Sequence, residues 1–399
     1  MLNTHNKRNE SQRVHAKPLQ GIFGIRIGGV DKLGDALERT QLSVLRLLLG
    51  KRRELFLKCG HTQPPWVITI ETIRSARIFG MFLHGSHNAQ RHHALRHAQR
   101  DTIRRNNFFH EHREHEGIHY YLDGPEDAEI TIVYIHGFTL AAKSWHLQVA
   151  HIGDRARHLL IDLRGHGETG EYPIEDCNID GAADDVAKIY QHVGIQGETI
   201  IIGHSLGGMV ALNLLRRFKK IRQNTRNCIL VATAVESFAS QGFPQVLALP
   251  IVDNIRNAVE LAPKQVQAFR EDIAALIAPT LAATVFVHPT PDSVINFHAQ
   301  MINDTPLNTL VGFLDDLQHH AETEAKTALD NLPGLVIVGE KDLVTPLSQA
   351  EKIQHMWPTS SLQEIPDAGH MIILEQPWII NKALDHALAQ TRASNSALR

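Results

Sequence analysis

From about Glu116 to the C-terminus, short apolar runs alternate with segments of helical periodicity. The runs are rich in Ile, Val and Leu, as expected of strands that are buried on both faces of a sheet. The segments between them repeat apolar residues every three or four positions, which predicts amphipathic helices. The pattern predicts strands over Ile130–Ile135, His158–Leu163, Thr199–Ile202, Cys228–Ala232 and Leu335–Val338, and helices over Ala182–Val193, Met209–Phe218 and Pro346–Met356.

This alternation predicts an α/β fold in which a mostly parallel central sheet carries helices on both faces. The alternation is interrupted once, between Ala232 and Leu335, where the spacing is helical and no strand is evident. We therefore expect a helical insertion at about residues 234–333 rather than a second sheet domain. Its predicted helices cover Val246–Leu261, Pro263–Leu276 and Thr309–Ala321.

The first 116 residues differ from the rest in charge. They hold 20 basic and 10 acidic side chains, a net charge of +10, whereas the remainder holds 20 basic and 33 acidic side chains, a net charge of −13. Residues 31–57 have the spacing of an amphipathic helix, and nine of the 26 histidines lie between His84 and His119. We predict a basic, His- and Arg-rich extension over residues 1–116, largely helical or partly disordered, followed by the main domain over residues 117–399.

The basic extension has two interpretations. It can meet an anionic partner such as a membrane surface, or it can lie on the acidic remainder of its own chain, which we favour. No zinc-finger spacing or RNA-binding aromatic motif occurs in residues 1–116, so we predict no nucleic-acid partner. His93 and His97 could share a helix face, but no Cys or Asp cluster completes a metal site around them.

Composition narrows the class of protein. The chain is 43% hydrophobic and 21% charged with a mean hydropathy of −0.18, which excludes a mainly disordered chain and a multi-span membrane protein. The polar start does not resemble a signal peptide, and no uninterrupted apolar run is long enough to span a bilayer. The three cysteines form no C-x-x-C pair, which favours a reducing compartment. We expect a cytoplasmic protein, with peripheral membrane contact through the basic segment left open.

The sharpest motif is Gly203-His204-Ser205-Leu206-Gly207-Gly208, which follows one predicted strand and opens the next helix. A G-x-S-x-G turn between a strand and a helix is so tight that it exposes the serine hydroxyl, and it needs glycines where a Cβ would meet neighbouring backbone. The motif alone is a weak signal, and its strand-turn-helix setting strengthens it. Ser205 is the predicted nucleophile.

A serine hydroxyl needs a general base, and the base needs an acid to orient it. Asp342 lies in the loop after the strand Leu335–Val338, at the sheet edge where α/β proteins build their sites. It is the predicted acid, with Glu340 as a weaker alternative. His370 lies in a Gly-containing loop after the strand-like run Leu362–Ile365, and it is the predicted base. The order Ser, acid, His along the chain is the order found in the type of α/β fold that carries a G-x-S-x-G turn between a strand and a helix.

Acyl transfer also needs donors for the negative oxygen of the tetrahedral intermediate. His136-Gly137-Phe138 follows the first strong strand, and Leu206 follows the nucleophile. We predict that the backbone N–H groups of Phe138 and Leu206 form this oxyanion hole, with the Phe138 ring lining the acyl pocket.

Taken together, these motifs give the chain from about Glu116 onward a resemblance to the α/β-hydrolase superfamily, in its lidded esterase- and lipase-like branch. The family's second motif usually continues with serine, where this chain has Glu168-Thr169. Residues 1–116 have no counterpart in the minimal fold. The resemblance rests on His136-Gly137-Phe138, Asp162-Leu163-Arg164-Gly165-His166-Gly167, the Ser205 motif, Gly339-Glu340-Lys341-Asp342 and Ala368-Gly369-His370.

The resemblance implies that the insertion at about 234–333 is a cap over the active site that selects the substrate. It also implies that Arg164 and His166 brace loops. An apolar roof favours acyl or other hydrophobic substrates. The candidate pocket residues are Phe138, His204, Phe238, Phe243, Leu247, Phe286, Met301 and Phe313.

These observations predict a serine hydrolase that cleaves a carboxylic ester, small or lipid-like, through an acyl-enzyme at Ser205. A serine at this position argues against relatives that use an aspartate nucleophile. A thioesterase, a cofactor-free haloperoxidase or a carbon–carbon bond hydrolase would use a similar triad, and a non-catalytic binding module is a further alternative. The mechanism requires no metal or organic cofactor.

Overall fold

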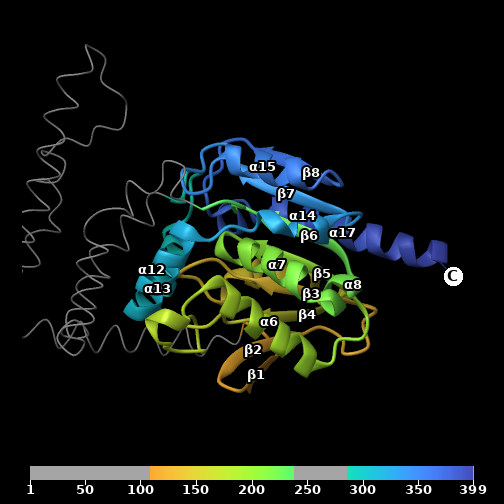
Figure 1. The fold of residues 1–399 in the computed structure, drawn as a ribbon, viewed down its shortest axis with the longest axis horizontal. Coiled ribbons are helices and arrows are strands. Elements are labelled where there is room, and N and C mark those ends of the chain that lie inside the picture. The colour runs from red at the N-terminus through yellow and green to blue at the C-terminus, as the bar shows by residue number, and fades with distance from the viewer. Residues whose placement is uncertain (1–107, 238–284, 399) are drawn as a thin grey trace, which may run out of the picture. The chain divides into compact units, whose positions relative to one another are not determined.

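The computed structural model describes residues 108–237 and 285–398. These residues form one eight-stranded sheet with helices packed around it (Figure 1). The strand order is β1-β2-β4-β3-β5-β6-β7-β8. β1 pairs antiparallel with β2, and β2 pairs antiparallel with β4, whereas all neighbours from β4 to β8 pair parallel. The α/β fold class is confirmed. The strands are β1 (Glu111–His115), β2 (Ile118–Asp123), β3 (Ile130–Ile135), β4 (Arg157–Ile161), β5 (Glu198–His204), β6 (Thr225–Val231), β7 (Gly334–Gly339) and β8 (Ser360–Ile365).

Helices cover both faces of the sheet. The α-helices are α5 (His146–Ile152), α6 (Ile179–Val193), α7 (Leu206–Arg217), α8 (Lys219–Asn224), α12 (Asp292–Asp304), α13 (Leu307–His319), α14 (Lys326–Leu329), α15 (Leu347–Met356), α16 (Ile372–Glu375) and α17 (Pro377–Leu398). Short 3-10 turns are η1 (Ala142–Trp145), η2 (Gly153–Arg155), η3 (Ile174–Asp176) and η5 (Thr323–Ala325).

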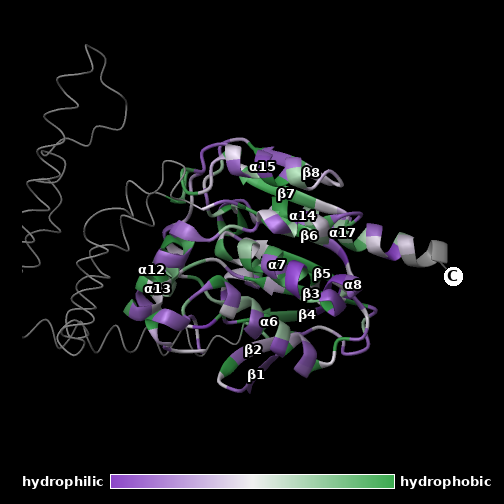
Figure 2. Ribbon diagram, in the orientation of Figure 1, coloured by the Kyte–Doolittle hydropathy of each residue, from purple (hydrophilic) through white to green (hydrophobic). Residues whose placement is uncertain are grey.

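The central strands are buried on both faces because successive side chains point to opposite sides. Val133 and Ile135 pack with α6, α7 and α15 in one hydrophobic cluster, whereas Ile132 and Tyr134 pack with α5 and α17 in another. Figure 2 shows hydrophobic colour along these strands and hydrophilic colour on much of the surrounding helices. A strand whose side chains are buried in both clusters is apolar at nearly every position. The sequence contains such continuous apolar runs.

The two antiparallel strands were not predicted. In β2, buried and half-buried residues alternate, and most of β1 is exposed, so neither strand has the continuous apolar run of the central strands. β1 lies inside the segment 1–116 that was assigned to the extension, and it pairs with β2 from Glu111 to His115. The sheet therefore starts before the predicted boundary; residues 1–107 lie outside the described part of the chain.

Between β6 and β7, the described part of the predicted insertion is helical. The predicted helix Thr309–Ala321 corresponds to α13, and α12 precedes it as a helix that the pattern did not specify. The predicted helices Val246–Leu261 and Pro263–Leu276 lie outside the described residues. α12 and α13 lie together at one end of the sheet, and the C-terminal end of α17 projects from the other (Figure 1).

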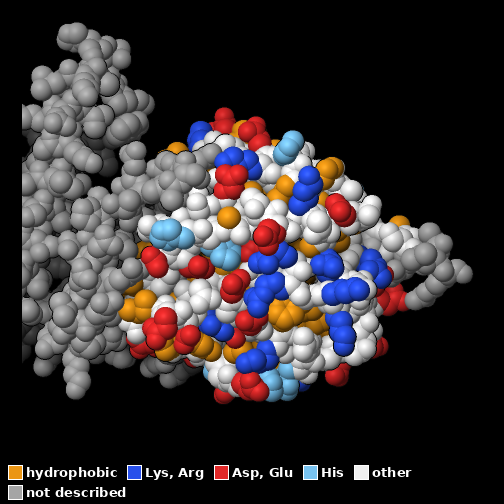
Figure 3. Space-filling view, viewed as in Figure 1, with side chains coloured by type: hydrophobic (Ala, Val, Ile, Leu, Met, Phe, Trp, Pro, Cys, Tyr) orange, Lys and Arg blue, Asp and Glu red, His pale blue; other side chains and the backbone are white. Residues whose placement is uncertain are grey.

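Charged side chains are unevenly distributed on the described surface (Figure 3). Lys and Arg gather over α7 and α8, where Arg216, Arg217 and Lys219 follow one another closely. A groove of about 760 Å³ between η3 and α13 has an acidic lining that includes Glu175, Asp180, Asp315 and Asp316. Docking of the basic extension on its own chain stays a prediction.

None of the helices in the described ranges combines the length and the apolarity that a bilayer crossing needs.

Candidate active site

Ser205 occupies the tight turn between β5 and α7. Its backbone has φ 53° and ψ −119°, a conformation that non-glycine residues rarely adopt and that is characteristic of strained functional positions. The Ser205 N–H donates to the carbonyl of Val231 at 2.9 Å. A Cβ at Gly203 would collide with the backbone of Gly207, and one at Gly207 would collide with the carbonyls of Ile135 and His136. The turn therefore requires both glycines of the motif.

The structure brings together the three residues that were predicted as nucleophile, base and acid. The Ser205 Oγ lies 3.0 Å from Nε2 of His370. The other ring nitrogen of His370, Nδ1, lies 2.9 Å from Oδ2 of Asp342. All three side chains are buried, so these hydrogen bonds are shielded from bulk water. The arrangement permits His370 to take the serine proton while Asp342 orients the ring.

Asp342 is held as a carboxylate. Its Oδ1 accepts the N–H groups of Val344 and Thr345 at 2.8 and 2.9 Å, and its Oδ2 accepts the Thr345 hydroxyl at 2.8 Å. Burial acts to raise the pKa of Asp342, but the neighbouring His370 and the Thr345 hydrogen bonds outweigh it, so that the pKa is lowered. The alternative acid, Glu340, instead accepts the exposed N–H of Asp367 at 3.0 Å. Of the two candidate acids, Asp342 is the one that bonds to the His370 ring, and its catalytic role stays a prediction.

The loop that carries His370 is fixed by a residue that the sequence analysis missed. The Glu375 carboxylate accepts the N–H of Gly369 at 3.0 Å and the N–H groups of Val287, at 2.8 Å, and His288. In addition, the N–H of His370 donates to the carbonyl of Val285 at 2.9 Å. Glu375 is buried at the end of an Ile-Ile-Leu run. A carboxylate in so apolar a run is the signal that could have revealed it.

His204, a predicted pocket residue, lies against the base. Its Nε2 donates to the backbone carbonyl of His370 at 3.0 Å, and the two rings have centroids 5.0 Å apart. Burial, together with the proximity of His370, lowers the pKa of His204 to about 3, which keeps its ring neutral. His204 thus contacts both the backbone and the ring of His370, and its contact with a substrate stays a prediction.

The predicted oxyanion donors lie on either side of the nucleophile. Leu206 is the first residue of α7, where N–H groups have no partner within the helix. A Cβ at Gly137 would lie 3.2 Å from Cβ of Ser205, so the chain leading to Phe138 passes close to the nucleophile. Within the described residues, neither the Phe138 nor the Leu206 N–H donates a hydrogen bond. Their role as donors to a substrate oxygen stays a prediction.

The loops around this site are braced by the second sequence motif. Arg164 forms a bidentate ion pair with Asp185, with distances of 2.8 and 2.9 Å, and His166 accepts the N–H of Thr139 at 3.2 Å through Nε2. Burial lowers the pKa of His166 to about 3. These contacts agree with the bracing role expected for Arg164 and His166.

The predicted pocket residues fall in different places. Phe138 is half-buried and its ring centroid lies 6.3 Å from that of Phe313, which is fully buried in α13. Phe286 is half-buried beside α12, and Met301 is buried on that helix. Contact of these four residues with a substrate stays a prediction. The remaining candidates, Phe238, Phe243 and Leu247, lie outside the described residues.

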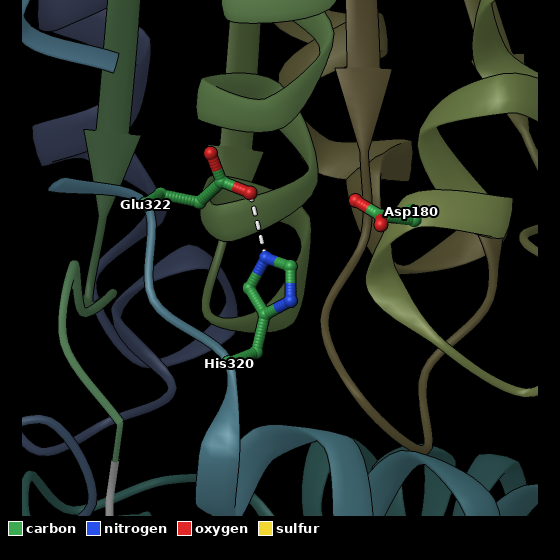
Figure 4. Close-up of side chains that lie close together, drawn as sticks. All are labelled: Asp180, His320 and Glu322. Atoms are coloured by element: carbon green, nitrogen blue, oxygen red, sulfur yellow. Dashed lines mark hydrogen bonds and ion pairs between the residues drawn. The ribbon is translucent and has the colours of Figure 1, made fainter. Parts of the chain in front are cut away.

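One other cluster has side chains that can bind metals. Ligand atoms of Asp180, His320 and Glu322 lie within 4.8 Å of one another, and Figure 4 shows His320 bonded to Glu322 with Asp180 facing them. The carboxylates are already engaged: Asn213 donates to both at 2.6 Å, and the Arg216 guanidinium donates to Glu322 at 3.0 Å. The cluster is a satisfied ion network that joins α6, α7 and the end of α13.

The chain is similar to known proteins over most of its described part. The family profile described as "alpha/beta hydrolase fold" matches residues 130–377, which is more than half of the chain. Among curated relatives, a pimeloyl-[acyl-carrier protein] methyl ester esterase of Neisseria meningitidis is 29% identical over 214 residues, covering 53% of this chain and 74% of the relative. The dihydrolipoyllysine-residue acetyltransferase component of the acetoin cleaving system of Pseudomonas putida is 27% identical, and the match covers 63% of this chain but only 62% of that relative.

The described fold also aligns with solved structures. A thermophilic esterase from Thermogutta terrifontis is 26% identical with a TM-score of 0.56, and the alignment covers 68% of this chain and 93% of the esterase. An enol-lactonase from Burkholderia xenovorans aligns with a TM-score of 0.57 at 20% identity over 70% of this chain and all of that structure, a likeness of fold alone.

Proposed function

The chain belongs to the α/β-hydrolase family, and on that premise we propose that it is a serine hydrolase that cleaves carboxylic esters through an acyl-enzyme at Ser205. The observation that carries the proposal is the unbroken hydrogen-bonded series from Ser205 Oγ through His370 to Asp342. The esterases among the relatives and structural neighbours support the choice of ester hydrolysis.

In the first half of the reaction, Ser205 Oγ attacks the ester carbonyl carbon while Nε2 of His370 takes the hydroxyl proton. The carboxylate of Asp342 stabilises the imidazolium that forms. As the tetrahedral intermediate collapses, His370 returns the proton to the alcohol oxygen, which leaves. The acyl group is then bonded to Ser205 as an ester.

In the second half, His370 takes a proton from a water molecule that attacks the acyl-enzyme, and it returns that proton to Ser205 Oγ as the acid is released. In both halves, negative charge develops on the former carbonyl oxygen. The N–H groups of Phe138 and Leu206 are the donors that we assign to this oxygen, and such preorganised donors lower the barrier by about 3–4 kcal/mol each.

The helices α12 and α13 belong to the insertion that we propose acts as a cap. They lie at one end of the sheet (Figure 1), and the segment before α12 is bonded to the His370 loop through Val285 and Glu375. Apolar residues of this region, Phe286 and Met301, favour a substrate with a hydrophobic acyl or alcohol part.

Hydrolysis of a p-nitrophenyl ester series from acetyl to palmitoyl, by the wild type and by Ser205→Ala, tests the proposal. We expect kcat to fall by roughly 10⁴- to 10⁶-fold in the variant, as when a triad serine is removed elsewhere. A fluorophosphonate should label Ser205 in the wild type and leave the variant unlabelled. No hydrolysis of any ester together with no labelling would refute the proposal, whereas labelling without ester hydrolysis would favour a thioester or carbon–carbon bond substrate.

A further inference from the structure

His298, on α12, is a buried histidine that the proposed mechanism does not use. The residue is only 4% exposed, and its Nδ1 has no hydrogen-bond partner among the residues that the structure describes. Within the described residues, the ring forms no hydrogen bond at either nitrogen. Leaving a buried polar group unpaired costs about 1–3 kcal/mol, and an apolar side chain at this position of α12 would avoid that cost.

Contacts connect His298 to the catalytic base. The Phe286 ring stands edge-on to the His298 ring, with centroids 5.4 Å apart and an interplanar angle of 80°. Phe286 directly follows Val285, whose carbonyl accepts the backbone N–H of His370 at 2.9 Å. His298 is therefore one aromatic contact and one peptide away from the loop that carries the base, on the helix that we assign to the cap.

The chemical state of His298 is set by the same surroundings. Burial, with a smaller effect from the nearby His370, lowers the pKa of His298 to about 4. At neutral pH the ring is thus uncharged and offers one N–H donor and one lone-pair acceptor. An uncharged, buried imidazole beside Phe286 suits a neutral oxygen better than an ionised group, because a charge would be desolvated there.

We propose that His298 is a specificity-determining residue that hydrogen-bonds a second, uncharged oxygen of the ester substrate, away from the scissile carbonyl. The inference rests on the proposed function and deepens it: the preferred substrates are esters with a keto, ether or hydroxyl oxygen in the acyl or alcohol part. Apolar pockets commonly orient their ligands with a few such polar groups. Substrate binding then pairs the ring nitrogen that finds no partner in the described part of the chain.

Two pairs of nearly isosteric esters test this role. On the acyl side, p-nitrophenyl 4-oxopentanoate is compared with p-nitrophenyl pentanoate; on the alcohol side, 2-methoxyethyl butyrate is compared with butyl butyrate. We expect His298→Phe to reduce the kcat/KM ratio of the oxygenated to the plain ester by about 5- to 10-fold in at least one pair, the value of one neutral hydrogen bond. His298→Gln, which retains a donor and an acceptor, should recover part of that ratio.

A matched control is Ile302→Val, which alters a buried residue of the same helix without changing its hydrogen bonding. It should leave both ratios unchanged. Equal loss of kcat/KM for both members of each pair in His298→Phe would overturn the inference, because a packing role affects both esters alike; unchanged ratios would overturn it too. Labelling of Ser205 by a fluorophosphonate in every protein keeps the proposed function separate, since labelled protein with unaltered ratios refutes only the role of His298.

Discussion

The Glu375 carboxylate offers the most direct test of how the base is positioned. It is 5% exposed and accepts three backbone N–H groups, from Gly369 on the His370 loop and from Val287 and His288 on the segment before α12. Its removal would therefore release two segments that are far apart in the sequence. We expect Glu375→Ala and Glu375→Gln to differ in the number of these donors that lose their acceptor.

The expected loss of stability follows from the number of hydrogen bonds that each variant loses. Each lost hydrogen bond to a buried carboxylate costs about 1–2 kcal/mol, so Glu375→Ala, which loses all three, should lower the free energy of unfolding by about 3–6 kcal/mol. Glu375→Gln keeps an oxygen for the N–H groups of Val287 and His288 but turns an amide donor toward Gly369, which should cost about 1.5–3 kcal/mol. In the folded Gln variant, a shift of the base should lower kcat by about 10- to 100-fold with a smaller change in KM.

Urea unfolding monitored by tryptophan fluorescence gives the free energies, and steady-state hydrolysis of the best ester gives kcat and KM. The control is Glu364→Gln on β8, which makes the same change of charge at an exposed position and should shift stability by less than about 0.5 kcal/mol. If Glu375→Gln loses stability while kcat stays at the wild-type value, the carboxylate supports the fold without positioning His370, and our reasoning is refuted.

Two further predictions concern ionised groups. Asp342→Asn, which leaves the loop intact but no longer stabilises an imidazolium, should lower kcat by about 10⁴-fold with an unchanged circular dichroism spectrum; a loss of less than tenfold would contradict the assignment. For His320, burial lowers the pKa, but the hydrogen bond to Glu322 and the charges of Asp316 and Glu322 together outweigh it, so the folded pKa lies above 6.5. Its stabilisation is thus complete below the unfolded pKa and is lost as pH rises through the folded pKa. Urea unfolding from pH 6 to 9 should therefore show a gap between wild type and His320→Gln that narrows with rising pH, and a constant gap would disprove the coupling.

The central strands could be predicted because burial on both faces leaves a local mark. Ile130–Ile135 is apolar at nearly every position, and β3 has the predicted bounds. β1 left no such mark, because Glu111–His115 is an exposed edge strand whose place depends on its pairing with β2. Edge strands owe more to their neighbours than to their own hydrophobicity, so the start of the sheet was placed too late.

In the candidate site, too, some features could be predicted from the sequence and others depend on the tertiary structure. The sequence alone determined the Ser205 turn, because the Gly203 and Gly207 backbones fit only without a Cβ, and it narrowed the acid and the base to two short loops. Only the tertiary structure decided between Asp342 and Glu340, since the choice depends on which carboxylate reaches the His370 ring.

The same holds for the groups around the triad. Glu375 meets Val287 across 88 positions of the chain, and Glu322 meets Asn213 across 109. The role that we propose for His298 depends on its burial beside Phe286. No local sequence pattern indicates this burial. A sequence motif encodes the backbone conformation of a few consecutive residues, whereas the partners of a buried polar group are set by packing between distant segments. The residues of the candidate site could therefore be predicted from the sequence, whereas the buried groups that hold them in place could be identified only in the fold.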